Sequence, residues 1–537
     1  MKAPEAVPVS GEEMESLRQR VESRQLLDSD FALLGTILAT VQKIALLLQK
    51  KRASIVRLRQ MIFGARTEKT ETVVGGDIRE KEPKAKGKGH GRRRGGDYWG
   101  ARRQTVPHSE LAVGQRCPDC AHGNLYKLKG PSVQMWFTAV APIQATALEC
   151  QRLRCSGCGK VFTASPPAEA AQKYDESVGS MIALLRYGTG MPHSRLGQLQ
   201  RSMGIPLPPS VQWELVRQMA ESCFEVLYQI LYRHAAQGQL MLLDDTRMKI
   251  LQELLRHSSP LDIPIQTENT STVQGRKGTY TTAIVSTTTE GRQIVVYATG
   301  KRQAGANMDQ LLSQRASDLP APIQMCDALP QNLPKRFQVI LANCNSHARR
   351  RFFDLSEDYP HEVEIVLYSF QCLYANDETA LTMALSPQER LELHRLRSGF
   401  VMEGLRDWMN AQMEKKKVEP NSALGEAFGY YLKHWKALTL FLREPGAPLD
   451  NNGCERVLKR AIVHRKNSLF YKTYRGAEVG DIFMSVIATC TLNKVNPFHY
   501  LTEVARHAAK ARADPESWLP WNYLQQLNTQ PAVGVPA

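Results

Sequence analysis

The N-terminal part of the chain carries an apolar repeat of seven residues. From residue 12 to residue 62 helix breakers are rare, and apolar residues occupy the a and d positions of a heptad: Leu34, Val41, Leu48, Ile55 and Ile62, with Ile37, Ile44 and Leu58. This pattern predicts a helical, coiled-coil segment over residues 1–70 that pairs two copies of the chain into a homo-oligomer. An amphipathic helix packed on the chain's own body would show the same pattern, and Lys51 weakens the seam.

The repeat is absent from residues 71–105. This stretch includes "GGDIREKEPKAKGKGHGRRRGGDYWGARRQ", which is rich in glycine and basic residues and has no hydrophobic period. We predict a disordered linker over residues 71–105. It either follows DNA phosphates or serves as a solvated tether.

A helical pattern returns over residues 171–237. The segment "HSRLGQLQRSMGIPLPPSVQWELV" predicts a helix, a Gly-Ile-Pro turn and a second helix capped by Ser210. The unit fits a helix-turn-helix that contacts DNA. The second helix is also long and apolar enough to belong to the core, so both interpretations stand.

Buried-strand patterns begin near residue 238. The run "QLMLL" predicts a strand that ends at Asp244 and Asp245, and "TYTTAIVSTTTEGRQIVVYAT" predicts a hairpin with its turn at Glu290-Gly291. A helix capped by Asn307 follows, then "PIQMC" predicts a strand that ends at Asp327, and "FQVIL" predicts another. This order is that of an RNase H-like sheet. We therefore predict an α/β RNase H-like catalytic domain over residues 238–480, with a helical insertion at about 345–443 and a helical segment and tail over 481–537.

Three carboxylates of this domain are candidate catalytic residues. The first and fourth strands of an RNase H-like sheet are neighbours, so Asp244 and Asp327 should converge at one edge, where Glu455 on a later helix completes a site for divalent cations. Each acid has a plainer alternative. The two aspartates could begin turns after their strands, and Glu455, three residues after Asn452, could belong to a helix cap.

Cysteine spacing indicates a second kind of metal site. Two CxxC pairs, 34 residues apart, offer four thiolates for one tetrahedral zinc ion: Cys117, Cys120, Cys155 and Cys158. The residues between the pairs alternate like strands, which predicts a zinc ribbon over residues 106–170; four unligated thiols are the alternative. Cys344 and His347 also have a metal-like spacing, but no second pair lies near them in the sequence.

Charge narrows the class of partner. A formal net charge of +16 and a pI near 9.3 favour an extended anionic partner. No apolar run of about 18 residues is present and the N-terminus lacks the apolar core of a signal peptide, which favours nucleic acid over a membrane and a cytoplasmic location. The eleven cysteines fit reduced thiols in that compartment.

Basic residues follow the third acid. No acidic residue lies between Glu455 and Glu478, and Lys472 and Arg475 in this interval are expected to continue the basic run along the DNA strand. Together with two arginines after His347, these side chains are expected to contact DNA phosphates: Arg349, Arg350, Arg456, Lys459, Arg460, Arg465 and Lys466. The alternative is pairing with acids of the helical insertion, such as Glu389, Glu392 and Glu403.

Several motifs resemble those of DDE transposases of the insertion-sequence sixty-six family, over nearly the whole chain. "MIFGARTEK" resembles the segment that closes the family's N-terminal helix, and the CxxC pairs resemble its zinc-binding segment. "LLDDT" resembles its Asp-Asp/Glu-Thr motif, "NCNSHARRRFFD" its His-Ala-Arg-Arg signature, and "DNNGCER", "RKNSLF" and "TLNKVNPFHYL" its C-terminal block. The resemblance implies that Asp244, Asp327 and Glu455 are the catalytic acids.

The resemblance also implies an activity and partners. Two Mg²⁺ ions held by the three acids would support cleavage of double-stranded DNA at the ends of a mobile element and strand transfer into a target. Two small companion proteins are often encoded beside such transposases, and a bacterial, nucleoid-associated location is expected. Two other functions stay open: an RNase H-like nuclease that never joins strands, and an inactive zinc-ribbon DNA-binding regulator.

Overall fold

The computed structural model describes residues 172–253 and 278–528, the short segments 113–116, 142–148, 151–154 and 161–163, and residues 17, 20, 21 and 30. The predicted linker at 71–105, both CxxC pairs and nearly all of the predicted coiled coil lie outside the described residues. Among the residues that are described, every helix is too short or too polar to span a lipid bilayer.

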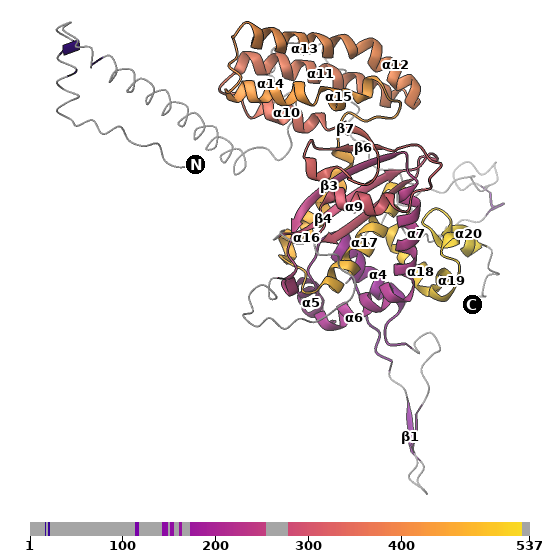
Figure 1. Cartoon of the computed structure of the whole chain (residues 1–537). Helices are drawn as coiled ribbons and strands as arrows, with labels where there is room; N and C mark the ends of the chain where they lie inside the picture. The colour runs from indigo at the N-terminus through magenta and orange to yellow at the C-terminus, as the bar shows by residue number, and fades with distance from the viewer. Residues whose placement is uncertain are drawn as a thin grey trace. The chain divides into compact units, whose positions relative to one another are not determined.

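A mixed five-stranded sheet forms the centre of the larger unit (Figure 1). Its strands are β3 (Leu240–Met248), β4 (Thr279–Thr287), β5 (Gln293–Gly300), β6 (Ile323–Cys326) and β7 (Ile340–Asn343). The spatial order is β5-β4-β3-β6-β7, in which β3, β4 and β5 are antiparallel while β6 and β7 run parallel to β3. The first and fourth strands of the sheet are therefore neighbours, which is consistent with the predicted RNase H-like arrangement.

Three local predictions need correction. The strand β3 does not end at Asp244 but continues to Met248, because its polar second half also pairs with β4, up to Met248 opposite Thr279. The helix α9 (Ala304–Leu312) begins before Asn307, whose side-chain amide donates instead to the Thr282 hydroxyl at 2.7 Å. The strand β7 begins three residues later than the run "FQVIL" suggested. The hairpin turn itself is confirmed, with Gly291 at a φ of 80° that favours glycine.

Helices precede the sheet, as expected. They are α4 (Glu176–Ala183), a π-helical turn η3 (Leu184–Gly188), α5 (His193–Ser202), α6 (Pro209–Met219), a π-helical turn η4 (Ala220–Phe224) and α7 (Glu225–Ala236). Ser210 lies within α6 and does not cap it. The apolar side chains of α6 and α7, such as Val216, Leu227 and Leu231, have no exposed surface, and α7 packs on β4 and β5. The helices α6 and α7 contribute to the core, and contact of this region with DNA stays a prediction.

The outer edge of β5, which has no neighbouring strand, is covered by a helix. Two long helices follow the insertion, α16 (Asn452–Ser468) and α17 (Tyr474–Leu492). Four side chains of α17 and its C-cap, spaced one turn apart, accept hydrogen bonds from alternate N–H groups of β5: Asp481 from Thr299 at 2.6 Å, Ser485 from Tyr297 at 2.9 Å, Thr489 from Val295 at 3.0 Å and Asn493 from Gln293 at 3.3 Å. This polar ladder satisfies donors that an edge strand otherwise leaves free.

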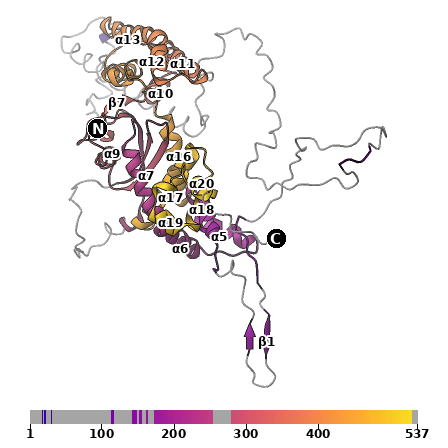
Figure 2. The same ribbon diagram turned by 90° about the vertical axis from the view of Figure 1, so that its right-hand side faces the viewer.

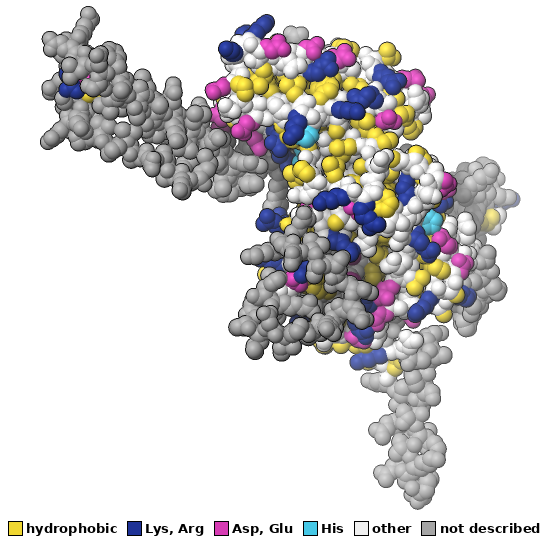
Figure 3. Space-filling view, in the orientation of Figure 1, with side chains coloured by type: hydrophobic (Ala, Val, Ile, Leu, Met, Phe, Trp, Pro, Cys, Tyr) yellow, Lys and Arg dark blue, Asp and Glu magenta, His cyan; other side chains and the backbone are white. Residues whose placement is uncertain are grey.

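Between β7 and α16 the chain is helical and strand-free, as predicted for the insertion. The helices are α10 (Asn345–Phe353), α11 (Pro360–Thr382), α12 (Pro387–Arg397), α13 (Gly399–Glu414), α14 (Ala423–Lys433), α15 (Trp435–Leu438) and a 3₁₀ turn η6 (Leu440–Leu442). They form one bundle in both ribbon views (Figure 2), around the buried rings of Phe352, Phe370 and Tyr431. Acidic, basic and exposed apolar side chains are interspersed over the visible face of this bundle (Figure 3).

The C-terminal helices complete this unit: α18 (Pro497–Arg506), α19 (Ala508–Ala513), a 3₁₀ turn η7 (Glu516–Trp518) and α20 (Tyr523–Asn528). A separate compact unit holds β1 (Arg152–Arg154) and β2 (Val161–Thr163), which pair antiparallel on either side of the second CxxC pair in the sequence. The sequence between the CxxC pairs has a strand-like alternation over residues 132–155, but residues 144–148 of it have no regular structure.

Candidate catalytic site

The parallel register of β3 and β6 brings the two aspartates together. Leu242 pairs with Met325 at the last matched position, so two further residues along each chain place Asp244 opposite Asp327. Asp327 directly follows β6, whereas Asp244 lies within β3, at the point where β3 loses β6 as a neighbour but remains paired with β4. The carboxyl ends of adjacent parallel strands are where functional side chains commonly meet.

The helix α16 brings the third acid to the same edge. A Cβ atom on Gly453 would lie 2.8 Å from Cδ1 of Leu242, so the first turn of α16 packs closely on the Leu242 side chain of β3. The fully buried Asn451 fixes this approach, because its side-chain amide donates to the Leu243 carbonyl at 2.9 Å. Glu455 then projects from the first turn of α16 and is about one-third exposed.

The helix-cap alternative for Glu455 is wrong. The N-cap residue of α16 is Asn451, which makes no side-chain capping bond, and Asn452 is already the first helical residue. In a capping box that begins at Asn451, the reciprocal glutamate would occupy position 454, which is a cysteine. The carboxylate of Glu455 instead lies near His347, with 3.7 Å between Oε1 and the ring Nδ1.

Charge repulsion and burial characterise the site. Burial, followed by the negative charges of Asp327 and Glu455, raises the pKa of Asp244 to about 7, although a hydrogen bond from the Asp245 N–H acts in the opposite direction. Burial also raises the pKa of Cys454, and Asp244 and Glu455 contribute to the increase. Carboxylates whose charges act on one another in this way favour a bound cation, whose positive charge offsets both effects.

The neighbouring Asp245 faces the other side of the sheet. Successive strand residues point to opposite faces, and the Asp245 carboxylate accepts from the N–H of Ala304 at the start of α9, at 3.4 Å. Burial raises the pKa of Asp245, with a smaller contribution from the charge of Asp327. The two adjacent aspartates therefore have different surroundings, and Asp244 is the one that shares its face with α16.

Asp327 has a structural role in addition to its position. One carboxylate oxygen accepts hydrogen bonds from the Leu329 N–H at 3.3 Å and from the Asn332 side-chain amide, as expected of an aspartate that begins a turn. Its second oxygen makes no hydrogen bond to any residue that the structure describes. The turn alternative is thus correct for one oxygen and leaves the other available to a ligand.

A cavity of about 540 Å³ lies beside Asp327. Its walls come from α10 and α14 and include His347, Arg350, Arg351 and Tyr430. The Arg351 guanidinium lies over the Tyr430 ring, 3.8 Å from the ring centre. Of the two predicted DNA contacts on α10, Arg350 is exposed and lines this cavity, while Arg349 is partly buried on the same helix.

The basic residues of α16 fall into two groups. Arg456, Lys459 and Lys466 are exposed and form no ion pair within the described part of the chain. Arg465 instead donates to the Thr246 hydroxyl at 2.8 Å and to the Arg247 carbonyl at 2.7 Å, and Arg460 donates to the Thr491 hydroxyl at 3.1 Å. The acids of the insertion that were the alternative partners form no ion pair with this run in the described residues: Glu389, Glu392 and Glu403.

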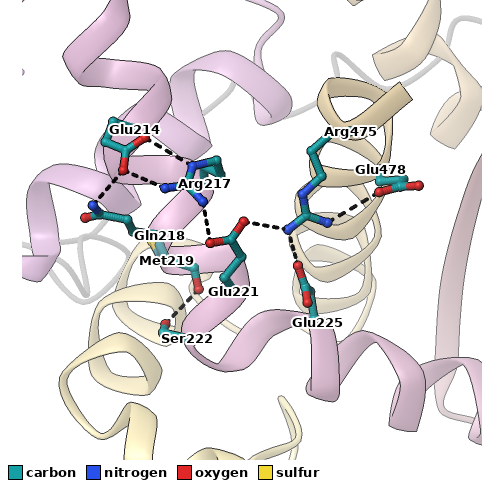
Figure 4. A network of polar contacts seen from close by, with 9 residues as sticks. All are labelled: Glu214, Arg217, Gln218, Met219, Glu221, Ser222, Glu225, Arg475 and Glu478. Carbon is teal, nitrogen blue, oxygen red and sulfur yellow. Dashed lines mark hydrogen bonds and ion pairs between the residues drawn. The ribbon is translucent and has the colours of Figure 1, made fainter. Parts of the chain in front are cut away.

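Arg475 does not continue the basic run toward a ligand. Figure 4 shows its guanidinium among three carboxylates, those of Glu221, Glu225 and Glu478, which join α17 to the α6–α7 helix. Hydrogen bonding, to Glu225 first, raises the pKa of Arg475, and the bond from Arg475 is the largest contribution that lowers the pKa of Glu221. The negative partners of Arg475 are therefore protein carboxylates and not DNA phosphates, which corrects the expectation for this residue.

Sequence reasoning missed one cluster at the site. Possible ligand atoms of Cys344, His347 and Glu455 all lie within 4.8 Å of one another. The Cys-x-x-His spacing was visible, but its third member follows more than a hundred residues later, across the helical insertion. Asn451 was also missed, although it lies directly before the helix that it positions.

Comparisons with known proteins agree with the sequence motifs. A model of the transposase IS66 family matches residues 172–479, which are 308 of the 537 residues. The uncharacterized protein y4hP of Sinorhizobium fredii is 28% identical over 201 residues, which cover 35% of this chain and 36% of that protein. The uncharacterized protein y4jD of the same organism is 30% identical over 188 residues, covering 34% and 36%. The chain thus spans about a third of the length of these curated relatives.

Proposed function

We propose, from the premise that this chain belongs to the IS66 family of transposases, that it catalyses Mg²⁺-dependent cleavage of DNA at the ends of an insertion sequence and transfers the cut strands into a target. Membership of the family implies a role in DNA transposition. The observation that supports the chemistry is that the charges of both Asp327 and Glu455 act on Asp244, which β3 places opposite Asp327 at the edge of the sheet.

The donor set fits divalent cations. Asp244, Asp327 and Glu455 offer only carboxylate oxygens, which are the ligands that Mg²⁺ prefers. Two bound ions would activate the attacking water or 3′-hydroxyl and stabilise the leaving oxygen. The protein's own contribution is to hold the acids in place: β3 and β6 fix the aspartates through their register, and Asn451 fixes the start of the helix that carries Glu455.

The exposed bases of α16 fit contact with the DNA backbone. Lys459 lies one helical turn beyond Glu455 on the same face, with Arg456 beside it and Lys466 further along the helix. Phosphates are the negative partners that these three side chains lack within the described residues. Arg349, Arg350, Arg460 and Arg465 complete the proposed DNA-contact set, although Arg460 and Arg465 already donate to protein groups.

The remaining parts of the chain have proposed supporting roles. The zinc ribbon over residues 106–170 holds one zinc ion through the four paired cysteines, and the helical region over 171–237 contributes to DNA binding. The segment over residues 1–70 pairs two copies of the chain, so that two element ends are processed together. The protein acts on the bacterial nucleoid, with two small companion proteins of the element as partners.

A combined cleavage and joining assay tests the proposal. Full-length protein is incubated with Mg²⁺, a labelled duplex that carries the terminal inverted repeat of the element, and a target plasmid. We expect a nick that leaves a 3′-hydroxyl at the element end, followed by a joined product. Cleavage without joining would identify a nuclease, and sequence-specific binding without cleavage would identify a DNA-binding regulator.

A further inference from the structure

We propose that His347 is a nitrogen ligand of one of the two catalytic cations, beside Glu455, and that this position therefore prefers a first-row transition ion such as Mn²⁺ to Mg²⁺. The inference deepens the proposed metal-dependent function and rests on it. It concerns a residue that lies outside the three acids and on a different element, at the start of α10.

The geometry around His347 is that of a ligand pair. Nδ1 of His347 lies 3.7 Å from Oε1 of Glu455, which is too far for a hydrogen bond. Metal bonds of about 2.1 Å place two donors of one ion roughly 3–4 Å apart, so this separation suits a shared cation. A third of the His347 side chain is exposed, yet Nδ1 itself is buried and has no hydrogen-bond partner in the described structure. A buried imidazole nitrogen without a partner is costly unless a ligand occupies it.

Buried hydrogen bonds hold His347 and Glu455 at this distance. The Asn345 side chain donates to the carbonyls of Leu438 at 2.9 Å and Leu449 at 3.1 Å, and its backbone N–H also donates to the Leu449 carbonyl. These bonds tie the start of α10 to the segment that leads into α16. On the other side, the Asn451 N–H donates to Sγ of Cys344 at 3.2 Å. The two helix starts are therefore fixed to each other, which prepares the pair for an ion.

Cys344 has a different role in this cluster. Its side chain is 1% exposed, and its sulfur already accepts the Asn451 N–H bond that joins the two helix starts. We assign it as a positioning residue, which leaves an imidazole nitrogen and carboxylate oxygens as the donor set. Carboxylate oxygens suit both Mg²⁺ and Mn²⁺, whereas imidazole suits first-row transition ions. Mn²⁺ accepts a nitrogen donor beside oxygen donors more readily than Mg²⁺ does, and this difference gives the expected preference for Mn²⁺ over Mg²⁺.

Pulsed electron paramagnetic resonance of Mn²⁺ bound to the full chain without DNA provides the direct test. Protein that contains ¹⁵N-histidine should show hyperfine coupling from a bound imidazole nitrogen. The coupling should vanish in His347→Ala and persist in His361→Ala, a matched control whose exposed imidazole lies at the start of α11. In titrations, His347→Ala should bind Mn²⁺ at least about 10-fold more weakly than the wild type, and the change for Mg²⁺ should be smaller. The value is the lower end of the roughly 10–100-fold loss of metal affinity that removal of even an outer-shell partner causes.

Two results would overturn the assignment: bound Mn²⁺ with no histidine coupling in the wild-type protein, or coupling that survives in His347→Ala. A wild-type spectrum without the coupling refutes the assignment even if the variant fails to fold. A charge-transfer band in Co²⁺-substituted protein that is lost in Cys344→Ser would show a sulfur ligand and contradict the role given to Cys344. These measurements need no DNA, so they are separate from the cleavage assay: wild-type protein that cuts DNA but lacks the coupling would refute only the His347 assignment.

Discussion

Removal of one hydroxyl from the polar ladder between α17 and β5 should destabilise the fold without creating a cavity. Thr489→Val is nearly isosteric, and both Thr489 and the Val295 strand position are buried. The variant leaves the Val295 N–H, which donates to the threonine hydroxyl at 3.0 Å, without an acceptor. An unsatisfied buried donor costs about 1–3 kcal/mol, and the added methyl group returns part of that, so we expect a loss of about 1–2 kcal/mol.

Urea denaturation and hydrogen exchange together measure this effect. The unfolding midpoint of the unit that contains the sheet should fall in Thr489→Val, and the Val295 amide should exchange faster than in the wild type. Thr382→Val is a suitable control, because Thr382 is exposed and its hydroxyl bonds only within its own helix, to the Glu378 carbonyl at 2.8 Å. Unchanged stability together with unchanged protection of the Val295 amide would refute the idea that α17 satisfies the strand edge.

Further predictions concern charge and metal. Because the pKa of Asp244 is raised to about 7, the metal-free folded protein keeps a proton there that the unfolded chain loses near pH 3.8. The free energy of unfolding is therefore highest below about pH 3.8 and falls as the pH rises towards 7. Calorimetry without metal should find Asp244→Asn more stable than the wild type at about pH 8 and little changed at about pH 4. Replacement of Arg456, Lys459 and Lys466 with Gln should flatten the slope of log affinity for duplex DNA against log salt by roughly two to three units, since each phosphate contact contributes about 0.9. Arg475→Gln should leave that slope unchanged and lower thermal stability instead, because its partners are protein carboxylates. Metal analysis of freshly purified protein should find about one zinc per chain, and loss of any of the four paired cysteines should remove it.

The sequence predicts the part of the site that depends on strand order. An apolar run followed by an acid predicted β6 and the position of Asp327 at its end. The order of strands and helices along the chain predicted that β3 and β6 are neighbours, as they are in the sheet. The end of β3 was not predictable in the same way, since "DDTR" is typical of a turn and forms a strand only because the threonine-rich start of β4 pairs with it.

Contacts between distant segments were beyond the sequence patterns. The partners of Arg475 on the α6–α7 helix lie about 250 residues earlier, and nothing in the local basic run distinguishes it from Lys466. The approach of His347 to Glu455 likewise depends on how the helical insertion returns the chain to the sheet. Local charge patterns identified the basic surface, whereas tertiary packing decides which of its members remain exposed.

The central claim is that Asp244, Asp327 and Glu455 act together on metal ions that cut DNA. Single-turnover cleavage of an element-end duplex in Mg²⁺ tests it most directly, with Asp244→Asn, Asp327→Asn and Glu455→Gln compared with Asp245→Asn. Loss of a metal ligand removes several kcal/mol of transition-state stabilisation, so each of the three amide variants should cut about 1,000-fold more slowly or worse while still binding the duplex, and Asp245→Asn should lose less. Cleavage by Asp327→Asn at the wild-type rate would contradict the account and require a different second acid.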